Sequence, residues 1–295
     1  MRVQHEQRTA VRAAVAAAAA RLEAAGIDSA RVDAEELAAH AAGVERSRLA
    51  LLDAPDADFF ARFDALVAAR SRRVPLQHLT GCAPFGPLLL QVGPGVFIPR
   101  PETESLLEWA VNAGTAAGVP ADMTIVDLCT GSGALAIALA RQWPAATVLA
   151  VDDSPAALRY ARRNAAGTGV DVVEADVTQA GLLPALDGLV DLVVANPPYI
   201  PDGAELEPEV AEHDPHHALF GGPDGMTVVA AVVGLAARWL RPGGRLGVEH
   251  DDTTSAQTVE LMLGTGLLTD IESRRDLAGR PRFVTAVRAG ATGRA

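Results

Sequence analysis

The chain of 295 residues contains no lysine, only two cysteines and few aromatic residues. All 25 basic residues are therefore arginines, which excludes catalysis by a lysine side chain. Cys82 and Cys129 give neither a disulfide framework nor metal-ligand spacing, so we expect a reducing, cytoplasmic location. Aromatic residues are 4% of a chain that is 49% hydrophobic, so aliphatic side chains and alanine must build the core.

Long apolar runs are also missing. No stretch approaches the ~20 residues of a membrane-spanning helix, which excludes a transmembrane protein. An alanine-rich stretch at residues 16–20 is followed at once by Arg21 and Glu23, so it predicts a helix rather than an export signal. The length suits one large domain or two ordinary ones.

Acidic residues outnumber basic ones by 37 to 25, which gives a formal net charge of −12. The first 75 residues hold 11 of each sign, so the rest of the chain carries the whole excess. A general nucleic-acid groove needs a basic face, and the acidic balance argues against one. A basic protein partner is compatible with this charge, and we expect a monomer that binds neither nucleic acid nor membrane.

The composition changes along the chain and separates a helical module from a linker. Residues 1–76 contain only helical patterns, with helices predicted at 29–42, where Ser29 is the expected N-cap, and at 58–70. Residues 77–101 are rich in glycine and proline, with short apolar runs between these breakers. This pattern is typical of a β-hairpin linker.

Residues 102–295 alternate short apolar strands with helices, beginning with a helix at Thr103. Strands are predicted at residues 124–128, 147–151, 170–174, 189–194, 245–249, 268–273 and 283–288. Further helices are predicted at residues 134–141, 155–166, 225–240 and 255–263, with a break at 241–244. The alternation implies a doubly wound α/β sheet.

The first candidate site is the sequence Asp-Leu-Cys-Thr-Gly-Ser-Gly at residues 127–133, between a strand and a helix. Glycines let a ligand approach the backbone, and the helix N-terminus offers free N–H groups. The dinucleotide fingerprint wants a third small residue, which Ala136 supplies. The loop alone therefore does not separate a nicotinamide cofactor from S-adenosylmethionine.

Two acids follow the next two strands. Asp152, about 20 residues after the glycines, is placed to accept the ribose hydroxyls of a nucleoside. Asp153 competes for that role, and either acid could instead cap the following helix. Asp152 is preferred because it directly ends the strand. Asp176 lies where an adenine amino group would come, although a solvated loop acid is the alternative.

The sequence Asn-Pro-Pro-Tyr at residues 196–199, called here the Asn-Pro-Pro-Tyr motif, follows a buried strand. Pro197 and Pro198 fix the backbone and remove two donors, so nearby carbonyls act as acceptors. Asn196 adds a side-chain carbonyl, and Tyr199 adds a flat face. This set suits an –NH2 group on a planar system, since acceptors that polarise its N–H bonds lower the barrier to attack by nitrogen.

These motifs resemble class I S-adenosylmethionine-dependent methyltransferases that act on amide or exocyclic nitrogen. The chain is most similar to the PrmC/HemK family, the protein-(glutamine-N5) methyltransferases of peptide chain release factors. The resemblance covers nearly the whole chain. It rests on residues 97–104, 127–133, 152, 196–200, 218–222, 224–225 and 276–283.

The resemblance implies a role for each matching residue. Cofactor contacts are implied at Cys129, Thr130, Gly131, Ser132, Gly133, Asp152, Asp176 and Asn196. Asn196, Pro197, Pro198 and Tyr199 would bind the substrate glutamine, with Asn196, Pro197 and Tyr199 as the catalytic set. The family usually has glycine in place of Cys129, where a small side chain should fit if the backbone avoids positive φ. Val177 is a second departure from the family. An aromatic residue at this position can stack on the adenine ring, and valine cannot.

The resemblance also implies the reaction and its partner. The methyl group of S-adenosylmethionine would pass to the glutamine of a Gly-Gly-Gln loop in class I release factors, leaving S-adenosylhomocysteine. Residues 1–76 would then recognise the substrate, 77–101 form the linker, and 102–295 form a Rossmann-like methyltransferase domain with a final antiparallel strand.

Other functions were weighed against this one. A ribosomal-protein glutamine methyltransferase shares the Cys129 variant, but the Phe-Gly-Gly and Arg-Pro-Arg-Phe blocks argue against it. A DNA adenine-N6 methyltransferase is disfavoured by the acidic balance and the lack of a target-recognition domain. A cofactor-retaining module without activity, and a nicotinamide dehydrogenase, remain as alternatives of other classes.

Three further features have open roles. The histidine cluster (His213, His216 and His217) has no spacing suited to a metal, and we expect none. Arg100 could be a rigid corner or could contact the cofactor carboxylate. Glu249, at the end of a predicted strand, is interpreted as solvated or as a supporting residue rather than a catalytic one.

Overall fold

The computed structural model describes residues 2–52, 55–115 and 122–290, and its contacts group the chain into two compact units. The first unit comprises Met1–Cys82 and Leu206–His213, and the second comprises Ala83–Glu205 and Asp214–Ala295. The boundaries predicted at 76 and 101 stay predictions. The grouping of residues 206–213 with the helical unit, far from it in sequence, is a feature that the sequence did not suggest.

The helical unit is built on apolar faces at helical spacing. Its helices are α1 (Arg2–Ala24), α2 (Ala30–Ala42), α3 (Arg46–Leu49), α4 (Phe59–Ser71), α5 (Leu76–Thr80) and α9 (Pro208–His213). Phe59, Phe63 and Val67 are buried on one face of α4, as the spacing predicts. Ser29 is the N-cap residue of α2, as predicted, but its side chain makes no capping hydrogen bond, because its Oγ donates to Asp33 Oδ1 at 2.7 Å.

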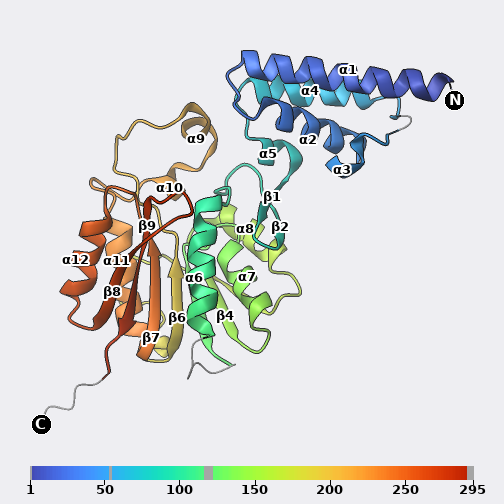
Figure 1. Cartoon of the computed structure of the whole chain (residues 1–295). Coiled ribbons are helices and arrows are strands. Elements are labelled where there is room, and N and C mark those ends of the chain that lie inside the picture. The colour runs from blue at the N-terminus through green and yellow to red at the C-terminus, as the bar shows by residue number, and fades with distance from the viewer. Residues whose placement is uncertain (1, 53–54, 116–121, 291–295) are drawn as a thin grey trace, which may run out of the picture. The chain divides into compact units, whose positions relative to one another are not determined.

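The second unit contains a seven-stranded sheet (Figure 1). Its strands are β3 (Thr124–Leu128), β4 (Thr147–Asp152), β5 (Val170–Glu174), β6 (Val190–Ala195), β7 (Leu240–Glu249), β8 (Leu268–Arg275) and β9 (Pro281–Arg288). They lie in the order β5-β4-β3-β6-β7-β9-β8, and β9 runs antiparallel to both of its neighbours. This order confirms the doubly wound α/β sheet with a final antiparallel strand.

Helices cover the two faces of the sheet. They are α6 (Glu104–Gly114), α7 (Ala134–Gln142), α8 (Pro155–Asn164), α11 (Thr227–Trp239) and α12 (Ser255–Gly264). The short helix α10 (His216–Leu219) and single turns at Pro101–Thr103 and Pro184–Leu186 lie in the connections. Val126 and Leu128 pack in the core cluster of α11 and α12, whereas Ile125 packs in that of α6 and α7. Successive side chains of β3 therefore point to opposite faces of the sheet and pack in both cores. The order of strands reverses between β3 and β6, where open α/β sheets bind ligands.

Two local features test the sequence expectations. The linker contains the expected hairpin, formed by β1 (Cys82–Phe85) and β2 (Leu88–Gln91). The helix predicted to end at residues 241–244 ends at Trp239, which confirms its end, whereas β7 begins at Leu240 rather than at the predicted Arg245. Leu240 pairs with Val190 and Arg245 with Leu192, so the register shifts at the Arg-Pro-Gly-Gly segment that lies between these two pairs.

Candidate active site

The glycine loop, residues 129–133, connects the end of β3 to the start of α7 at the switch point of the sheet. The backbone N–H of Thr130 donates to the Val151 carbonyl at 3.0 Å. The N–H of Gly131 donates to Asp152 Oδ2 at 2.8 Å. The loop is thereby fastened to the end of β4, beside the acid that is predicted to hold a ribose.

A buried acid, Asp127, supports the loop from the end of β3. Its Oδ2 accepts hydrogen bonds from Thr130 Oγ1 at 2.6 Å and from the N–H of Ala136 at 3.1 Å. Burial raises the pKa of Asp127 to about 7, and these two donors oppose the rise. Thr130 and Ser132 are buried as well. The predicted contacts at these two residues would therefore come mainly from their backbone.

Backbone conformation explains the small residues of the loop. Gly131 and Gly133 have φ of 58° and 88°, in the left-handed region that favours glycine. A Cβ atom on Gly131 would meet nothing within 4 Å, so the loop leaves open space there for a ligand. A small side chain at Cys129 is expected to fit if the backbone avoids positive φ, but Cys129 has φ of 59°. This residue holds a conformation that costs a side chain about 1 kcal/mol or more.

The two candidate ribose acids have different environments. Asp152 Oδ1 accepts from the N–H of Ser154 at 2.9 Å, while its other oxygen holds the glycine loop. Burial raises the pKa of Asp152, opposed by those two N–H donors. Asp153 instead contacts His217, with 2.7 Å between Oδ1 and Nε2. Asp152 is thus the acid that faces the loop, and Asp153 is engaged elsewhere.

Asp176 follows β5 on the same edge of the sheet. Its Oδ1 accepts from the N–H and the hydroxyl of Thr178, at 2.8 and 2.6 Å, and the hydroxyl contact lowers the pKa of Asp176. The acid is therefore ionised and held in one orientation. Val177, predicted as a departure at a stacking position, is buried against the sheet and α11 core.

The Asn-Pro-Pro-Tyr motif begins where β6 ends, next to β3. Asn196 Nδ2 donates to Thr103 Oγ1 at 3.1 Å, and Thr103 itself is buried. Because the amide nitrogen is engaged there, the side-chain carbonyl of Asn196 is directed away from Thr103. Pro197 is buried and Asn196 is half-buried, so the motif has a fixed base and a polar side chain at its open edge.

Gly221 and Gly225 pack closely against the backbone of the Asn-Pro-Pro-Tyr motif. A Cβ on Gly221 would lie 2.4 Å from the Pro198 carbonyl oxygen, and one on Gly225 would lie 2.1 Å from that of Tyr199. The Ile200 N–H donates to Leu219 at 2.9 Å, and the Gly221 N–H donates back to Ile200 at the same distance. The Phe-Gly-Gly and Asp-Gly blocks of the sequence thus contact the backbone of the motif.

Two buried residues from distant segments support Asn196 and Tyr199: Glu249, for which sequence reasoning offered a supporting role as one alternative, and Thr103, which it missed. The Tyr199 hydroxyl donates to Glu249 Oε1 at 3.3 Å, and Glu249 is 2% exposed. Burial raises the pKa of Glu249 to about 7, while the Thr103 hydroxyl, Arg282 and Tyr199 lower it. Glu249 had been interpreted as solvated or supporting, and the structure shows it buried in direct contact with Tyr199. No motif signals this, because the contacts join distant segments.

Arg100 and two members of the histidine cluster have structural partners: the His216 ring stacks on Phe220, and His217 contacts Asp153. Arg100 forms an ion pair with Asp214 and lies over the Phe97 ring, 4.9 Å from its centroid. This arrangement supports the interpretation of Arg100 as a rigid corner. Across the described ranges, no group of three or more His, Cys, Asp or Glu side chains is placed to hold a metal ion.

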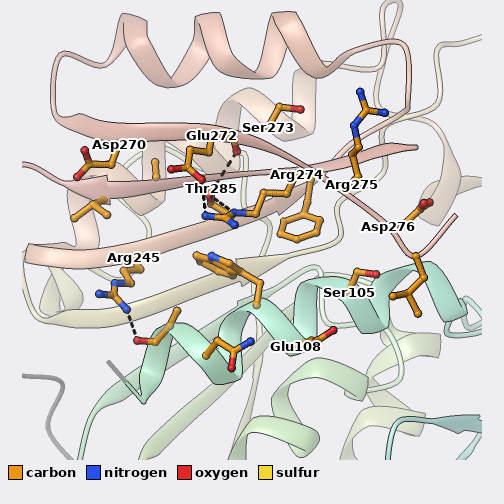
Figure 2. Close-up of a pocket in the computed structure, with 17 residues that line it drawn as sticks. Ser105, Glu108, Arg245, Asp270, Glu272, Ser273, Arg274, Arg275, Asp276 and Thr285 are labelled. Carbon is orange, nitrogen blue, oxygen red and sulfur yellow. Dashed lines mark hydrogen bonds and ion pairs between the residues drawn. The ribbon is translucent and has the colours of Figure 1, made fainter. Parts of the chain in front are cut away.

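A separate groove lies away from these residues. It has a volume of about 740 Å³ and is lined by α6, β7, β8 and β9 (Figure 2). Two of its arginines bond to other lining residues (Figure 2): Arg274 to Glu272 and Thr285, and Arg245 to the Ala113 carbonyl. None of the predicted site residues lines it.

Comparison with known proteins decides the family. A model of the PrmC N-terminal domain matches residues 13–81, and a model of a methyltransferase domain matches residues 120–270. A release factor glutamine methyltransferase of Mycolicibacterium smegmatis is 66% identical over 280 residues, which cover 95% of this chain and 98% of that protein. The chain belongs to the release factor glutamine methyltransferase family. It is a methyltransferase with the class I S-adenosylmethionine-dependent fold, and that fold implies use of S-adenosylmethionine.

Two other similarities define the breadth of this relationship. A protein of Streptomyces pristinaespiralis named 4-amino-L-phenylalanine/4-methylamino-L-phenylalanine methyltransferase is 43% identical, over 87% of this chain and 88% of that protein. The catalytic domain of hMettl16, solved with the MAT2A 3'UTR hairpin 6, has a TM-score of 0.53 and 14% identity, covering 76% of this chain and 81% of that chain. The second likeness shows the fold alone.

Within the described residues, no helix is both long and apolar enough to cross a membrane.

Proposed function

We propose that this chain transfers the methyl group of S-adenosylmethionine to the N5 amide nitrogen of the glutamine in the Gly-Gly-Gln motif of class I release factors. The observation that carries the proposal is the position of the Asn-Pro-Pro-Tyr motif, at the end of β6 beside the glycine loop. A planar –NH2 acceptor held at this motif would lie next to the predicted cofactor site.

The residues at the switch point fit this cofactor. Gly131 leaves open space, Asp152 ends β4 as an acceptor for ribose hydroxyls, and Asp176 is held ionised near the predicted adenine position. The cofactor supplies an activated methyl group on sulfur when it is bound, and S-adenosylhomocysteine is the product. We propose that no metal takes part.

The motif supplies what an amide nitrogen needs to act as a nucleophile. An amide lone pair is delocalised, so acceptors that hold both N–H hydrogens and favour a pyramidal nitrogen lower the barrier. The Asn196 carbonyl and a proline-flanked backbone carbonyl are suited to that role, and the Tyr199 ring offers a flat face to the carboxamide. The methylated nitrogen is a strong acid, so its proton passes to water. Holding the acceptor nitrogen and the methyl group in line at the Asn-Pro-Pro-Tyr motif supplies much of the rate.

The helical unit is proposed to recognise the release factor, and the acidic charge of the chain suits a basic protein substrate. A monomer that works in the cytoplasm without contacting nucleic acid completes the proposal. The 43% identity to a methyltransferase of 4-amino-L-phenylalanine favours one further candidate, because an arylamine also presents a planar –NH2 group. Free aromatic amines therefore belong among the acceptors to be tested.

The test is transfer of labelled methyl to purified release factor, followed by peptide mapping. Wild type should label the glutamine of the Gly-Gly-Gln loop, whereas Asn196→Ala should bind S-adenosylmethionine yet label poorly. A ribosomal protein, duplex DNA and 4-aminophenylalanine serve as parallel acceptors. Faster labelling of any of these than of release factor would overturn the proposed substrate.

A further inference from the structure

We propose that Glu249 is a positioning residue that sets the direction of the hydrogen bonds holding Asn196 and Tyr199. The proposal rests on the proposed function, since it concerns the orientation of the residues that would bind the acceptor –NH2 group. It assigns a role to a side chain that no sequence motif had placed in the site.

Three distant segments meet at Glu249. Tyr199, after β6, donates to Glu249 Oε1 at 3.3 Å, and Thr103, before α6, lies beside the same carboxylate. Arg282, on β9, is close enough to lower the pKa of Glu249, and Phe283 is the strand partner of Glu249. The Glu249 carboxylate therefore contacts Tyr199, at one end of the Asn-Pro-Pro-Tyr motif. It also lies beside Thr103, which holds Asn196 at the other end.

Arg282 is itself held in place. Its Nε donates to Asp276 Oδ2 at 3.3 Å, and Asp276 also accepts from the N–H of Arg280 at 3.0 Å. Asp276 is 2% exposed at its side chain and Arg282 is 14% exposed, so this pair is shielded from water. The Asp-Leu-Ala-Gly-Arg-Pro-Arg-Phe block, used above only for its resemblance, thus contributes a buried cation next to Glu249.

The chemistry of the acceptor fixes the direction of the relay. An ionised carboxylate can only accept, so in the proposed relay the Thr103 hydroxyl beside Glu249 turns its hydrogen toward the carboxylate. The oxygen of Thr103 then accepts from Asn196 Nδ2, as observed at 3.1 Å. Asn196 consequently directs its carbonyl oxygen away from Thr103, where it can accept from a substrate –NH2 group. A donor at position 249 would free the Thr103 hydrogen to bond the Asn196 carbonyl, which reverses the amide.

Glu249→Gln is the matched perturbation, because it keeps the size of the side chain and adds two N–H donors while removing the charge. We expect kcat for methyl transfer to release factor to fall by about tenfold or more, the scale seen when one preorganised group is lost. Glu249 acts on Asn196 only through Thr103 and contacts no other predicted cofactor residue, so the affinity for S-adenosylmethionine should fall less than kcat does. Thr103→Val should have the same effect, and the double variant should be no worse than either single one.

The pH profile separates positioning from simple packing. The groups that face or flank Glu249 are Tyr199, Arg282, Glu102 and His250; burial raises the pKa of Tyr199 and lowers that of His250. The carboxyl of Glu249 titrates at about 7, so kcat of wild type should rise about tenfold between about pH 6 and pH 8. Glu249→Gln should lose this step. Glu260→Gln, an exposed residue on α12, is the control and should keep it.

A measurement that needs no turnover completes the design. In full-length protein labelled with ¹⁵N, the side-chain amide signal of Asn196 should shift with a midpoint near pH 7 in wild type and stay constant in Glu249→Gln. A wild type that fails to methylate release factor would contradict the proposed function and leave this readout intact. An Asn196 signal that ignores pH, or a Glu249→Gln variant with wild-type kcat and an unchanged pH step, would overturn the relay.

Discussion

Cys129 allows the backbone argument of the glycine loop to be tested directly. Its φ of 59° costs a side chain about 1 to 2 kcal/mol, and glycine avoids this cost. Glycine loses about 0.5 to 1 kcal/mol relative to alanine through the entropy of the unfolded chain. Cys129→Gly should therefore be more stable than Cys129→Ala by about 0 to 1.5 kcal/mol, with a central value of about 0.8 kcal/mol. Alanine is the right reference because both variants lack the thiol.

The assay is urea denaturation of the full chain, with comparison of midpoints at equal slope. Gly264, at the end of α12, supplies the opposite control, since its φ is outside the left-handed region and a Cβ there would meet nothing within 4 Å. Gly264→Ala should stabilise the protein by about 0.5 to 1 kcal/mol. If Cys129→Ala proves more stable than Cys129→Gly, as Gly264→Ala should be relative to wild type, the left-handed conformation of residue 129 is wrong.

Two further predictions concern buried charges. The pKa of Asp127 is about 7 in the folded state, above its ordinary value of 3.8. Its favourable contribution to the free energy of unfolding is therefore full below about pH 4 and is lost as pH rises through 7. Between about pH 5 and pH 8, wild type should lose about 2 to 3 kcal/mol more unfolding free energy than Asp127→Asn, measured in urea at each pH; equal slopes would contradict this. In the helical unit, Arg70 bridges Asp33 and Glu209 at 2.7 Å each, with Asp33 nearly inaccessible. Arg70→Met alone should cost about 3 to 5 kcal/mol, whereas Arg70→Met with Asp33→Leu should recover most of the loss, as hydrogen exchange in α2 would show.

Short-range patterns were enough to predict most of the second unit. The strands at 124–128 and 170–174 have the predicted bounds. The first is a largely buried parallel strand, whose apolar run has clear ends. The glycine loop and the Asn-Pro-Pro-Tyr motif lie at the predicted edge, since each directly follows a strand. The helix ends at Trp239, next to the predicted Arg-Pro-Gly-Gly segment, but the strand begins five residues before the predicted Arg245, because Leu240 already pairs with Val190 of β6.

The supports of the site could not be predicted in the same way. Glu249 contacts Tyr199 across 50 positions of sequence, and Thr103 contacts Asn196 across 93. Such contacts depend on the order of strands in the sheet, which no local pattern encodes. The burial of Glu249 likewise depends on its pairing with Phe283, in a strand that follows it by more than thirty residues.

The glycines behind the Asn-Pro-Pro-Tyr motif show why its rigidity comes from outside the motif. Prolines restrict φ at Pro197 and Pro198 but leave the position of their carbonyl groups to the surrounding backbone. Gly221 and Gly225 approach those carbonyls so closely that a Cβ would overlap the oxygen at 2.4 and 2.1 Å. Backbone atoms cannot move aside as a flexible side chain can, so either substitution must displace the motif itself. The acceptor geometry on which amide methylation depends is therefore encoded as much in the Phe-Gly-Gly and Asp-Gly blocks as in the four residues that would touch the substrate.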